Sequence, residues 1–311
     1  MMNPIAAGRG AKTGRGRLNT IKIAPYLFTL PFAVSFLLFF LYPMASMFMM
    51  SFQRIEGISD AAFVGLMNFR RLLADAHVRT ALMNSVSFTI GIVVVNVVLA
   101  VLLAVVLNNR QTPARNAFRS ALYLPALTSI IVAGIFFRLF FGSGAGTPLN
   151  QLMTFFGLQT REWLYDTFST GIFVLVLTST WRWLGTNILY FLCGLQGIPQ
   201  ELYEAADIDG ANAFQRLLHV TIPGLKPILI FVITVTTYGG LRMFGESYVL
   251  WVNGATPGDV GLTMVLYIYK TAFTRFETGY AAAMSVALFL LLIVINLLYI
   301  KGLKIGAKED A

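Results

Sequence analysis

The chain has 311 residues, of which 57% are hydrophobic and only 12% are charged. An average soluble domain carries roughly 25% charged residues, so this composition indicates a protein whose solvent is largely lipid. The single cysteine, Cys193, excludes an intramolecular disulfide and a thiolate metal cluster, and its apolar neighbours predict a buried side chain.

Residues 1–22 are rich in glycine and basic side chains and predict a disordered cytoplasmic tail. The stretch GRGAKTGRG within this tail superficially resembles a phosphate-binding loop. It lacks the GxxxxGK(S/T) spacing, however, and no strand is expected before it. No other nucleotide-binding motif occurs in the sequence. Any ATPase that drives this protein must therefore be a separate polypeptide.

Six apolar segments are long enough to cross a bilayer, which takes ~20 helical residues. They lie at 23–53, 80–109, 121–141, 171–194, 226–248 and 277–300. The first is too long for the core of a signal peptide, and no small-residue cleavage site follows it, so we expect a retained helix. The predicted fold class is an all-α integral membrane protein with six transmembrane helices. Its parts are the tail, the first helix with a short outer segment (23–79), a transmembrane core (80–300) and a C-terminal cytoplasmic tail (301–311).

The distribution of Lys and Arg predicts the orientation in the membrane. Thirteen of these residues fall on segments that are cytoplasmic if the N-terminus is inside, and seven fall on the opposite segments. This excess indicates that both termini face the cytoplasm. The net charge of +9 is then a topology signal, because the basic residues flank membrane spans instead of forming a patch for nucleic acid.

Catalytic motifs are missing from the sequence. The two histidines, His77 and His219, are 142 positions apart, no GxSxG motif occurs, and acidic residues avoid the centres of the predicted spans. We therefore predict that this chain is not an enzyme and holds no metal or cofactor. A passive channel or a secondary transporter remains open on composition alone, since either needs only polar residues along a pore.

A polar segment at 199–227 interrupts the apolar second half of the chain. Acidic residues in its first turns favour a short helix over 201–208. Gly210 allows a sharp bend into a second short helix over 211–219, and two prolines are expected to close the segment. Two short helices at an angle form a knob. The alternative is an amphipathic helix on the membrane surface, but such helices usually carry Lys and Arg where this segment carries acids.

The same segment holds a specific pattern: Glu204, Ala205 and Ala206, then Asp209, Gly210 and Ala211, then Val220, Ile222 and Pro223. Its order and spacing resemble the EAA loop of ABC-importer permeases. The resemblance covers residues 24–300 approximately. Within the sugar-importer branch, the chain is similar in particular to the first of the two homologous permeases, notably over WRWLGTNILYFLCGLQGIPQELYEAADIDGA. One departure lies at 253–257, where NGATP stands in place of a common Gly-Gly-Pro turn and is still expected to turn the chain.

The resemblance implies a type I ABC-importer permease fold in the bacterial or archaeal plasma membrane. It implies as partners a second homologous permease, two ATP-binding subunits, an extracytoplasmic solute-binding protein and the lipid bilayer. The pattern residues of the knob, Glu204 to Pro223, would couple to the ATP-binding subunits, which alone would hold ATP and magnesium. A sugar or oligosaccharide would cross the membrane by alternating access.

Aromatic and polar residues in the fourth and fifth spans are candidates for the substrate pathway. Aromatic rings stack on the C–H faces of sugars and polar groups bond their hydroxyls, while a mid-span arginine costs about 2.5–3.5 kcal/mol unless it faces the interior. Tryptophans packed against neighbouring helices, an arginine bonded to a backbone carbonyl, and an Arg–Glu pair at the outer interface are the structural alternatives. The candidates are Trp181, Arg182, Trp183, Asn187, Tyr190, Tyr238, Arg242, Phe244 and Glu246.

Two features of this set are expectations in their own right. Arg242 and Glu246 are four positions apart and are expected to share one helix face. Arg138, Arg182 and Arg242 lie in or near spans and would also suit an importer of glycerol phosphates or anionic oligosaccharides.

Overall fold

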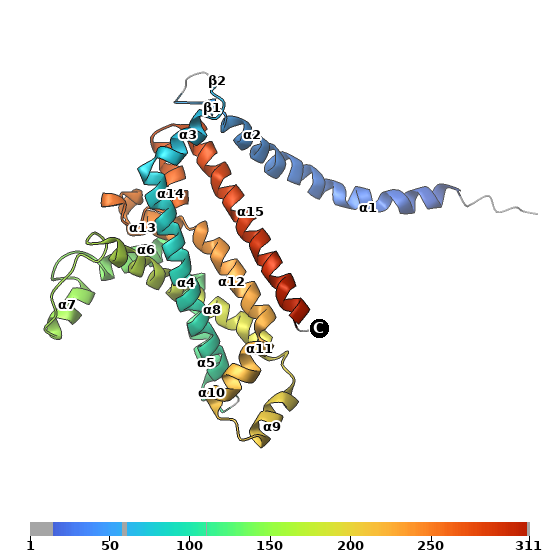
Figure 1. Cartoon of the computed structure of the whole chain (residues 1–311), viewed down its shortest axis with the longest axis vertical. Coiled ribbons are helices and arrows are strands. Elements are labelled where there is room, and N and C mark those ends of the chain that lie inside the picture. Colours follow the sequence, from blue (N-terminus) through green and yellow to red (C-terminus); the bar gives the residue numbers. More distant parts are fainter. Residues whose placement is uncertain (1–14, 58–60, 110, 310–311) are drawn as a thin grey trace, which may run out of the picture.

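The structure, a computed structural model, describes residues 15–57, 61–109 and 111–309, and these are mostly helical. Figure 1 shows an elongated bundle whose main helices run between two ends. One end holds the antiparallel strands β1 (Gln53–Arg54) and β2 (Ala62–Phe63), followed by α3 (Met67–Ala74). The opposite end holds α9 (Gln200–Ile208) and α10 (Ala213–Arg216). We call them the strand end and the knob end.

The first span stands apart from the rest of the chain. A π-helical turn at Leu37–Leu41 joins α1 (Arg15–Phe36) to α2 (Tyr42–Met50), and the candidate span is Ile23–Met50. None of its apolar window is buried by the rest of the chain, and Figure 1 shows α1 projecting away from the bundle. The predicted tail at 1–22 lies mostly outside the described residues, and its last part is helical from Arg15 onward.

Three long helices confirm the second, fourth and sixth predicted spans. Asp75 caps α4 (Ala76–Asn108) by accepting a hydrogen bond from the backbone N–H of His77 at 2.9 Å. A capping box of Thr167 and Thr170 starts α8 (Phe168–Leu195), which packs along α4 and forms the centre of the bundle. The last helix, α15 (Thr278–Glu309), holds the candidate span Thr278–Tyr299 and continues into the predicted C-terminal tail.

The third predicted span, 121–141, is wrong as a single helix. A 3₁₀ turn at Leu124–Leu127 ends α5 (Arg115–Tyr123), and α6 (Ile130–Phe140) follows it at an angle of 97°. The backbone of Thr128 is extended, and the Ser129 hydroxyl caps α6 by accepting from the N–H of Ile131 at 3.3 Å. Pro125 has no N–H to give to a helix, which favours the tightened turn before the break.

The fifth predicted span, 226–248, is wrong at its second end. The helix α12 (Lys226–Leu241) stops at Leu241, and α13 (Gly245–Leu250) begins after three residues that are not helical. At its first end α12 meets the helical run Ala213–Gly224 at 73°. Four helices could therefore span a membrane by themselves, or six if each bent pair counts as one span.

The two prolines flank the bend that closes the knob segment, as predicted, although both lie within helices. Pro223 is in the short helix α11 (Ile222–Gly224), at the end of the helical run Ala213–Gly224, and Pro227 is in the first turn of α12. The first turn of a helix needs no N–H donor, so Pro227 is tolerated there. The bend itself lies between them at Leu225.

Small residues bring the helices close together, as is common in membrane bundles. A Cβ on Gly185 of α8 would lie 2.1 Å from the carbonyl oxygen of Leu122 in α5, and one on Gly240 of α12 would lie 2.6 Å from the Thr89 hydroxyl of α4. Cys193 is exposed, so its predicted burial is wrong. An exposed thiol in an apolar span is still in an apolar surrounding, because lipid can cover it.

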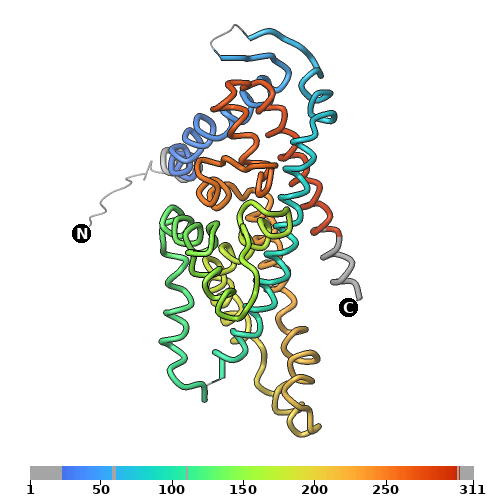
Figure 2. Tube along the Cα trace, turned by 90° about the vertical axis from the view of Figure 1, so that its left-hand side faces the viewer, coloured from blue at the N-terminus to red at the C-terminus, as the bar shows by residue number. Residues whose placement is uncertain are grey.

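The remaining elements are short. They are α7 (Pro148–Phe155), between α6 and α8, α14 (Met264–Tyr269), before α15, the 3₁₀ turns Val252–Gly254 and Pro257–Asp259, and the π-helical turn Lys270–Thr274. The NGATP segment turns the chain as predicted, because Asn253 and Gly254 have positive φ of 54° and 70°. Figure 2 shows, from the side, the knob as the extreme of one end of the molecule.

Candidate functional site

The segment 199–227 forms the predicted knob. The first helix, α9, ends at Ile208, and Gly210 turns the chain with a φ of 74° before α10 begins at Ala213. A residue with a Cβ would be strained at this φ, which explains the glycine. The second helix is longer than predicted, because it continues through a π-helical turn at Leu217–Thr221 as far as Gly224.

Side-chain contacts fix the two helices of the knob to each other. Arg216 of α10 forms an ion pair with Asp207 of α9, and the hydroxyls of Tyr203 and Thr221 lie 3.1 Å apart. Asn212 caps α10 in a reciprocal pair of hydrogen bonds with Gln215, at 2.8 and 2.9 Å. The sequence analysis missed this capping box, although the Asn-x-x-Gln spacing signals one. The knob is thus a firmly built unit.

The pattern residues lie on the surface of the knob. Glu204, Ala205 and Asp209 are exposed, Ala206 and Ala211 are half-buried, and Pro223 is exposed at the end of the second helix. Ile208 and Phe214 are bare, with exposed fractions of 88% and 66%. A groove of about 430 Å³ lies between the helices and is lined in part by Ala205, Ala206 and Ala211 of the pattern. An exposed surface with large apolar side chains is typical of a docking site.

The aromatic candidates on α8 pack against neighbouring helices, and each ring also stays partly exposed. Trp181 contacts the rings of Phe136 and Phe137 in α6, with centroids 6.5 and 5.4 Å away. Tyr190 meets Phe231 of α12 edge-on at 5.3 Å. The exposed fractions of Trp181, Trp183 and Tyr190 are 37%, 46% and 37%. These rings therefore serve packing within the chain and are also accessible to something outside it.

Arg182 and Glu246 are brought together across 64 positions of sequence. Nη1 of Arg182 donates a hydrogen bond to Oε1 of Glu246 at 2.8 Å, and the two side chains are 11% and 9% exposed. The guanidinium also lies 5.5 Å from the ring centroid of Trp183. Arg182 thus faces the interior, as its position in the span predicts.

The predicted pairing of Arg242 with Glu246 is wrong. The two residues do not share a helix face, because α12 ends at Leu241 and Glu246 belongs to α13. Arg242 is exposed. The other two candidates of this region, Tyr238 on α12 and Phe244, are half-buried. The ring of Phe244 packs on the rings of Tyr248 and Tyr269, with centroids 5.3 and 5.0 Å away.

Asn187 faces another helix rather than an open surface. Its amide donates to Oδ1 of Asn96 in α4 at 2.7 Å, and the two residues are 6% and 0% exposed. An unpaired amide in an apolar interior is costly, so this bond stabilises the contact of α4 with α8. Asn96 could not be predicted as the partner, since neither spacing nor charge links it to Asn187.

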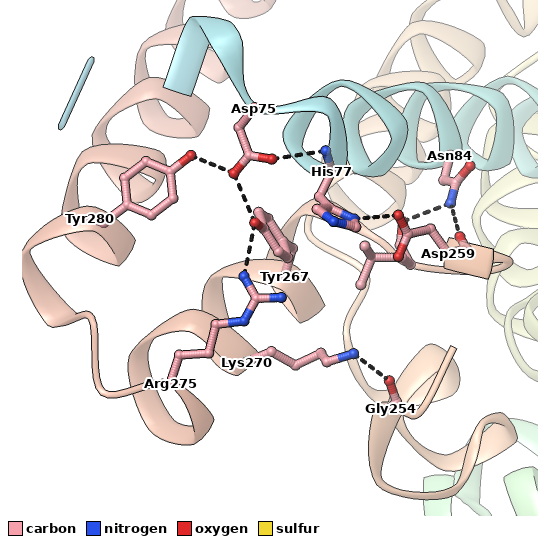
Figure 3. Close-up of polar contacts among 10 residues, drawn as sticks. Asp75, His77, Asn84, Gly254, Asp259, Tyr267, Lys270, Arg275 and Tyr280 are labelled. Carbon is pink, nitrogen blue, oxygen red and sulfur yellow. Dashed lines mark hydrogen bonds and ion pairs between the residues drawn. The ribbon is translucent and has the colours of Figure 1, made fainter. Parts of the chain in front are cut away.

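A polar cluster ties together three helices at the strand end. Figure 3 shows Asp75, at the start of α4, accepting hydrogen bonds from the hydroxyls of Tyr280 in α15 at 2.7 Å and Tyr267 in α14 at 2.8 Å. Arg275 donates to the Tyr267 hydroxyl at 3.1 Å. Nearby, a ring nitrogen of His77 lies 2.5 Å from a carboxylate oxygen of Asp259.

The environment of Asp75 favours its ionised form. Partial burial by itself raises the pKa of the Asp75 carboxyl, but the hydrogen bonds from Tyr280 and Tyr267 outweigh this and hold the pKa below its usual value. Within the described ranges, no three His, Cys, Asp or Glu side chains are grouped so as to hold a metal ion.

Comparison with known proteins decides the family. The model of the family described as "Binding-protein-dependent transport system inner membrane component" matches residues 96–300, which include the knob and the helices of the candidate pathway. The chain belongs to this family. It is a multi-pass subunit of an inner-membrane transport system and not an enzyme, and the alternative of a channel or secondary carrier is not favoured.

Similar proteins extend this finding to almost the whole chain. It is 46% identical over 300 residues to the arabinooligosaccharides transport system permease protein AraP of Bacillus subtilis (strain 168), which covers 96% of this chain and 95% of that protein. It is also 46% identical over 286 residues to AraP of Halalkalibacterium halodurans, with 91% and 89% covered.

The fold has a counterpart among solved structures. The bacterial alginate ABC transporter, in complex with an alginate pentasaccharide-bound periplasmic protein, contains a chain that matches with a TM-score of 0.78 over 92% of this chain and 96% of its own. The identity is 20%, so this likeness speaks for the fold. It confirms the predicted ABC-importer permease fold.

Proposed function

We propose that this chain is one of two homologous permeases in an ATP-driven, binding-protein-dependent importer, and that it carries neutral oligosaccharides of the arabinooligosaccharide class. The observation that carries the proposal is the 46% identity over 96% of the chain to the permease AraP. Substrate class depends on residues spread over several helices, so an identity of this extent is a better guide to it than any single motif.

The knob is proposed to couple the membrane domain to ATP-binding subunits. It is braced by the Asp207–Arg216 pair, and it exposes the acids Glu204 and Asp209 beside the apolar Ile208 and Phe214. A matching groove on an ATP-binding subunit would have an apolar floor and a basic rim. Two such subunits would serve the two permeases, and ATP and magnesium would be bound by them alone.

A second permease is proposed to cover surfaces that this chain leaves bare. No part of the apolar window of Ile23–Met50 is buried by the described residues. Trp183 and Tyr190, seven positions apart and so on one face of α8, are 46% and 37% exposed, and Trp181, on the opposite face, is 37% exposed. Tryptophan and tyrosine have polar atoms that need partners, which acyl chains do not offer. We propose that the substrate passes between these residues and their counterparts on the second permease.

The charge pattern of the candidate pathway favours neutral sugars. Glu246 neutralises Arg182, so this arginine is not a free cation for a phosphate or a carboxylate. The rings of Trp181, Trp183 and Tyr190 suit the C–H faces of sugar rings. Glycerol phosphates and anionic oligosaccharides are therefore the less favoured substrates.

The proposed cycle is alternating access. The strand end would face outward and receive the sugar-loaded binding protein, and the knob end would face the cytoplasm, as the excess of Lys and Arg predicts. Closure of the ATP-binding subunits would push on the knobs and open the pathway outward, and hydrolysis would return it. Each ligand shifts the equilibrium only through its different affinity for the two states.

The test is uptake into proteoliposomes that contain this chain with the second permease and the ATP-binding subunits that co-purify with it. Labelled arabinooligosaccharide is offered with its soluble binding protein, and unlabelled glycerol 3-phosphate and alginate oligosaccharide are the competitors. We expect uptake that requires internal ATP and is unaffected by either anion. Uptake of an anion instead would contradict the substrate class, and ATP-independent uptake would contradict the importer.

A further inference from the structure

The ion pair of Arg182 and Glu246 joins the long helix α8 to the segment that follows the end of α12. We define the re-entrant segment as residues 243–264, which leave the end of α12, form α13 and its following turns, and lead into α14. We propose that the Arg182–Glu246 pair is a latch, which holds the re-entrant segment against α8 and opens when the pathway changes sides. This inference rests on the proposed transport function.

The re-entrant segment is closed on itself by hydrogen bonds between its two halves. The hydroxyl of Thr263 donates to the carbonyl of Met243 at 2.8 Å, and that of Ser247 donates to the carbonyl of Gly261 at 2.5 Å. The backbone at both flanks is irregular, with non-helical residues at 242–244 and at 261–263, where Gly261 has a positive φ of 74°. A piece with internal bonds and irregular flanks can move as a unit.

Polar contacts hold this segment to α4, and mainly apolar contacts hold it to α6 and α8. Asn84 of α4 donates to the carbonyl oxygens of Asp259 and Leu262 at 2.8 and 2.9 Å, and His77 pairs with Asp259. The ring of Trp251 is fully buried and lies against Gly171 of α8, and its Nε1 donates to the carbonyl of Leu164 at 2.8 Å. Val249 fits against Gly134 of α6, where a Cβ would lie 2.4 Å from it. Apolar surfaces against glycine can slide over a short distance and keep their contact.

The ion pair differs from these contacts because it is all-or-none. Separating a buried pair leaves two charges without partners, whereas apolar residues of similar volume often hold a fold as well as the pair does. A buried pair is therefore poor evidence of stabilisation, and a registry or switch role is its best supported use. Glu246 is thus a positioning residue, since it acts on the segment through Arg182.

The unpaired Nε of Arg182 favours opening of the latch. Nε of Arg182 is buried and has no hydrogen-bond partner in the described part of the chain. An unpaired buried donor costs free energy that a new acceptor would recover. The guanidinium is therefore not fully satisfied in the arrangement seen here, and a rearrangement that offers it another oxygen would lower the cost of opening the latch.

The test uses the double variant R182M/E246L in the full complex, in which apolar residues of similar size replace the ion pair. We expect R182M alone to lower the amount of assembled complex several-fold, because Glu246 is left unpaired, and the double variant to recover it to within twofold of wild type. ATP hydrolysis without sugar-loaded binding protein should then rise at least threefold, since the latch no longer holds the resting state. The control for assembly is R54M/E56L, which removes an exposed pair whose side chains are 58% and 46% exposed; it is read for assembly alone, because it lies at the strand end proposed to receive the binding protein.

A double variant that assembles and hydrolyses ATP with the wild-type dependence on loaded binding protein would overturn the latch. If it does not assemble, R182K decides, since it keeps the charge and loses the planar fork of the guanidinium. A rise in unstimulated hydrolysis in R182K supports the latch, and unchanged hydrolysis overturns it. Failure of the proposed function is a different result, namely a wild-type complex that no sugar-loaded binding protein stimulates.

Discussion

Asp75 joins three helices at the strand end, because it caps α4 and accepts hydroxyl hydrogen bonds from α14 and α15. The pKa of its carboxyl is held below the usual value by these hydrogen bonds. The folded state therefore favours the ionised form more than the unfolded state does. This contribution to stability is present above the ordinary carboxyl pKa of about 3.9 and is lost as the pH falls through the lower folded value.

The first prediction concerns Asp75→Asn. The amide keeps an acceptor but loses the charge, so we expect a loss of about 1 kcal/mol at pH 7, allowing for solvent screening at this partly exposed site. The unfolding temperature in detergent should fall less steeply between pH 5 and pH 3 than that of wild type. The control is Asp166→Asn at an exposed position. A variant with the wild-type pH profile would show that the cluster does not act through this charge.

Arg182 shows how far residue-level prediction reaches. Its charge in the middle of an apolar span predicts an interior position, and the structure confirms this. Its partner could not be predicted, since Glu246 is 64 positions away and the spacing of four pointed to Arg242 instead. The break that separates Arg242 from Glu246 leaves no mark in hydropathy, because Met243 and Phe244 are themselves apolar.

At the scale of elements, the contact of α8 with α5 depends on Gly185, because this residue has no side chain. A Cβ on Gly185 would lie 2.1 Å from the Leu122 carbonyl oxygen and 2.6 Å from Cα of Tyr123. Both atoms belong to the backbone of α5, so neither can rotate away. The two helices would have to separate to admit even a methyl group.

We therefore predict that Gly185→Ala destabilises the folded permease by 1–3 kcal/mol or more, as overpacking does. The measurement is the unfolding temperature and the monodisperse fraction on size exclusion in detergent. Gly239→Ala in α12 is the matched control, because a Cβ there meets nothing within 4 Å and alanine favours a helix. Equal behaviour of the two variants would be incompatible with this contact.

The long elements could be predicted and the bent ones could not. Uncharged runs give α4, α8 and α15 because a helix is the simplest structure that satisfies every backbone group in lipid. Hydropathy averages over a window, so it passes over the break at Thr128 and Ser129 inside an apolar stretch. Pro125 and the capping Ser129 were the available signals for that break.

At the scale of the whole molecule, the orientation in the membrane is a further prediction. With both termini inside, a cysteine at position 56 should react with an impermeant thiol reagent added outside, and a cysteine at position 213 should not. Glu56→Cys and Ala213→Cys are made in a Cys193→Ser background, because Cys193 is exposed and would react as well. Reaction of the cysteine at position 213 with protection of the cysteine at position 56 would show that the chain has the opposite orientation.

The overall architecture was open to prediction because composition, spans and the knob pattern all indicate the same permease fold. How the surfaces of the chain are covered was not, since contacts with other subunits leave no pattern of their own in one sequence. The span Ile23–Met50 and the rings of α8 are apolar or aromatic in sequence, as buried helices are. Only the structure shows that the described residues bury none of the span's apolar window and leave these rings partly exposed.

The central claim is that the knob couples this chain to ATP-binding subunits. The most direct measurement is Glu204→Lys, which reverses an exposed charge on the knob without touching its internal Asp207–Arg216 pair. The same substitution at Glu162, an exposed acid far from the knob in sequence, is the control. We expect the Glu204→Lys permease to insert into the membrane at normal levels. The amount of ATP-binding subunit that co-purifies with it should fall at least tenfold, and uptake should be abolished. Normal co-purification and uptake in this variant would contradict the central claim.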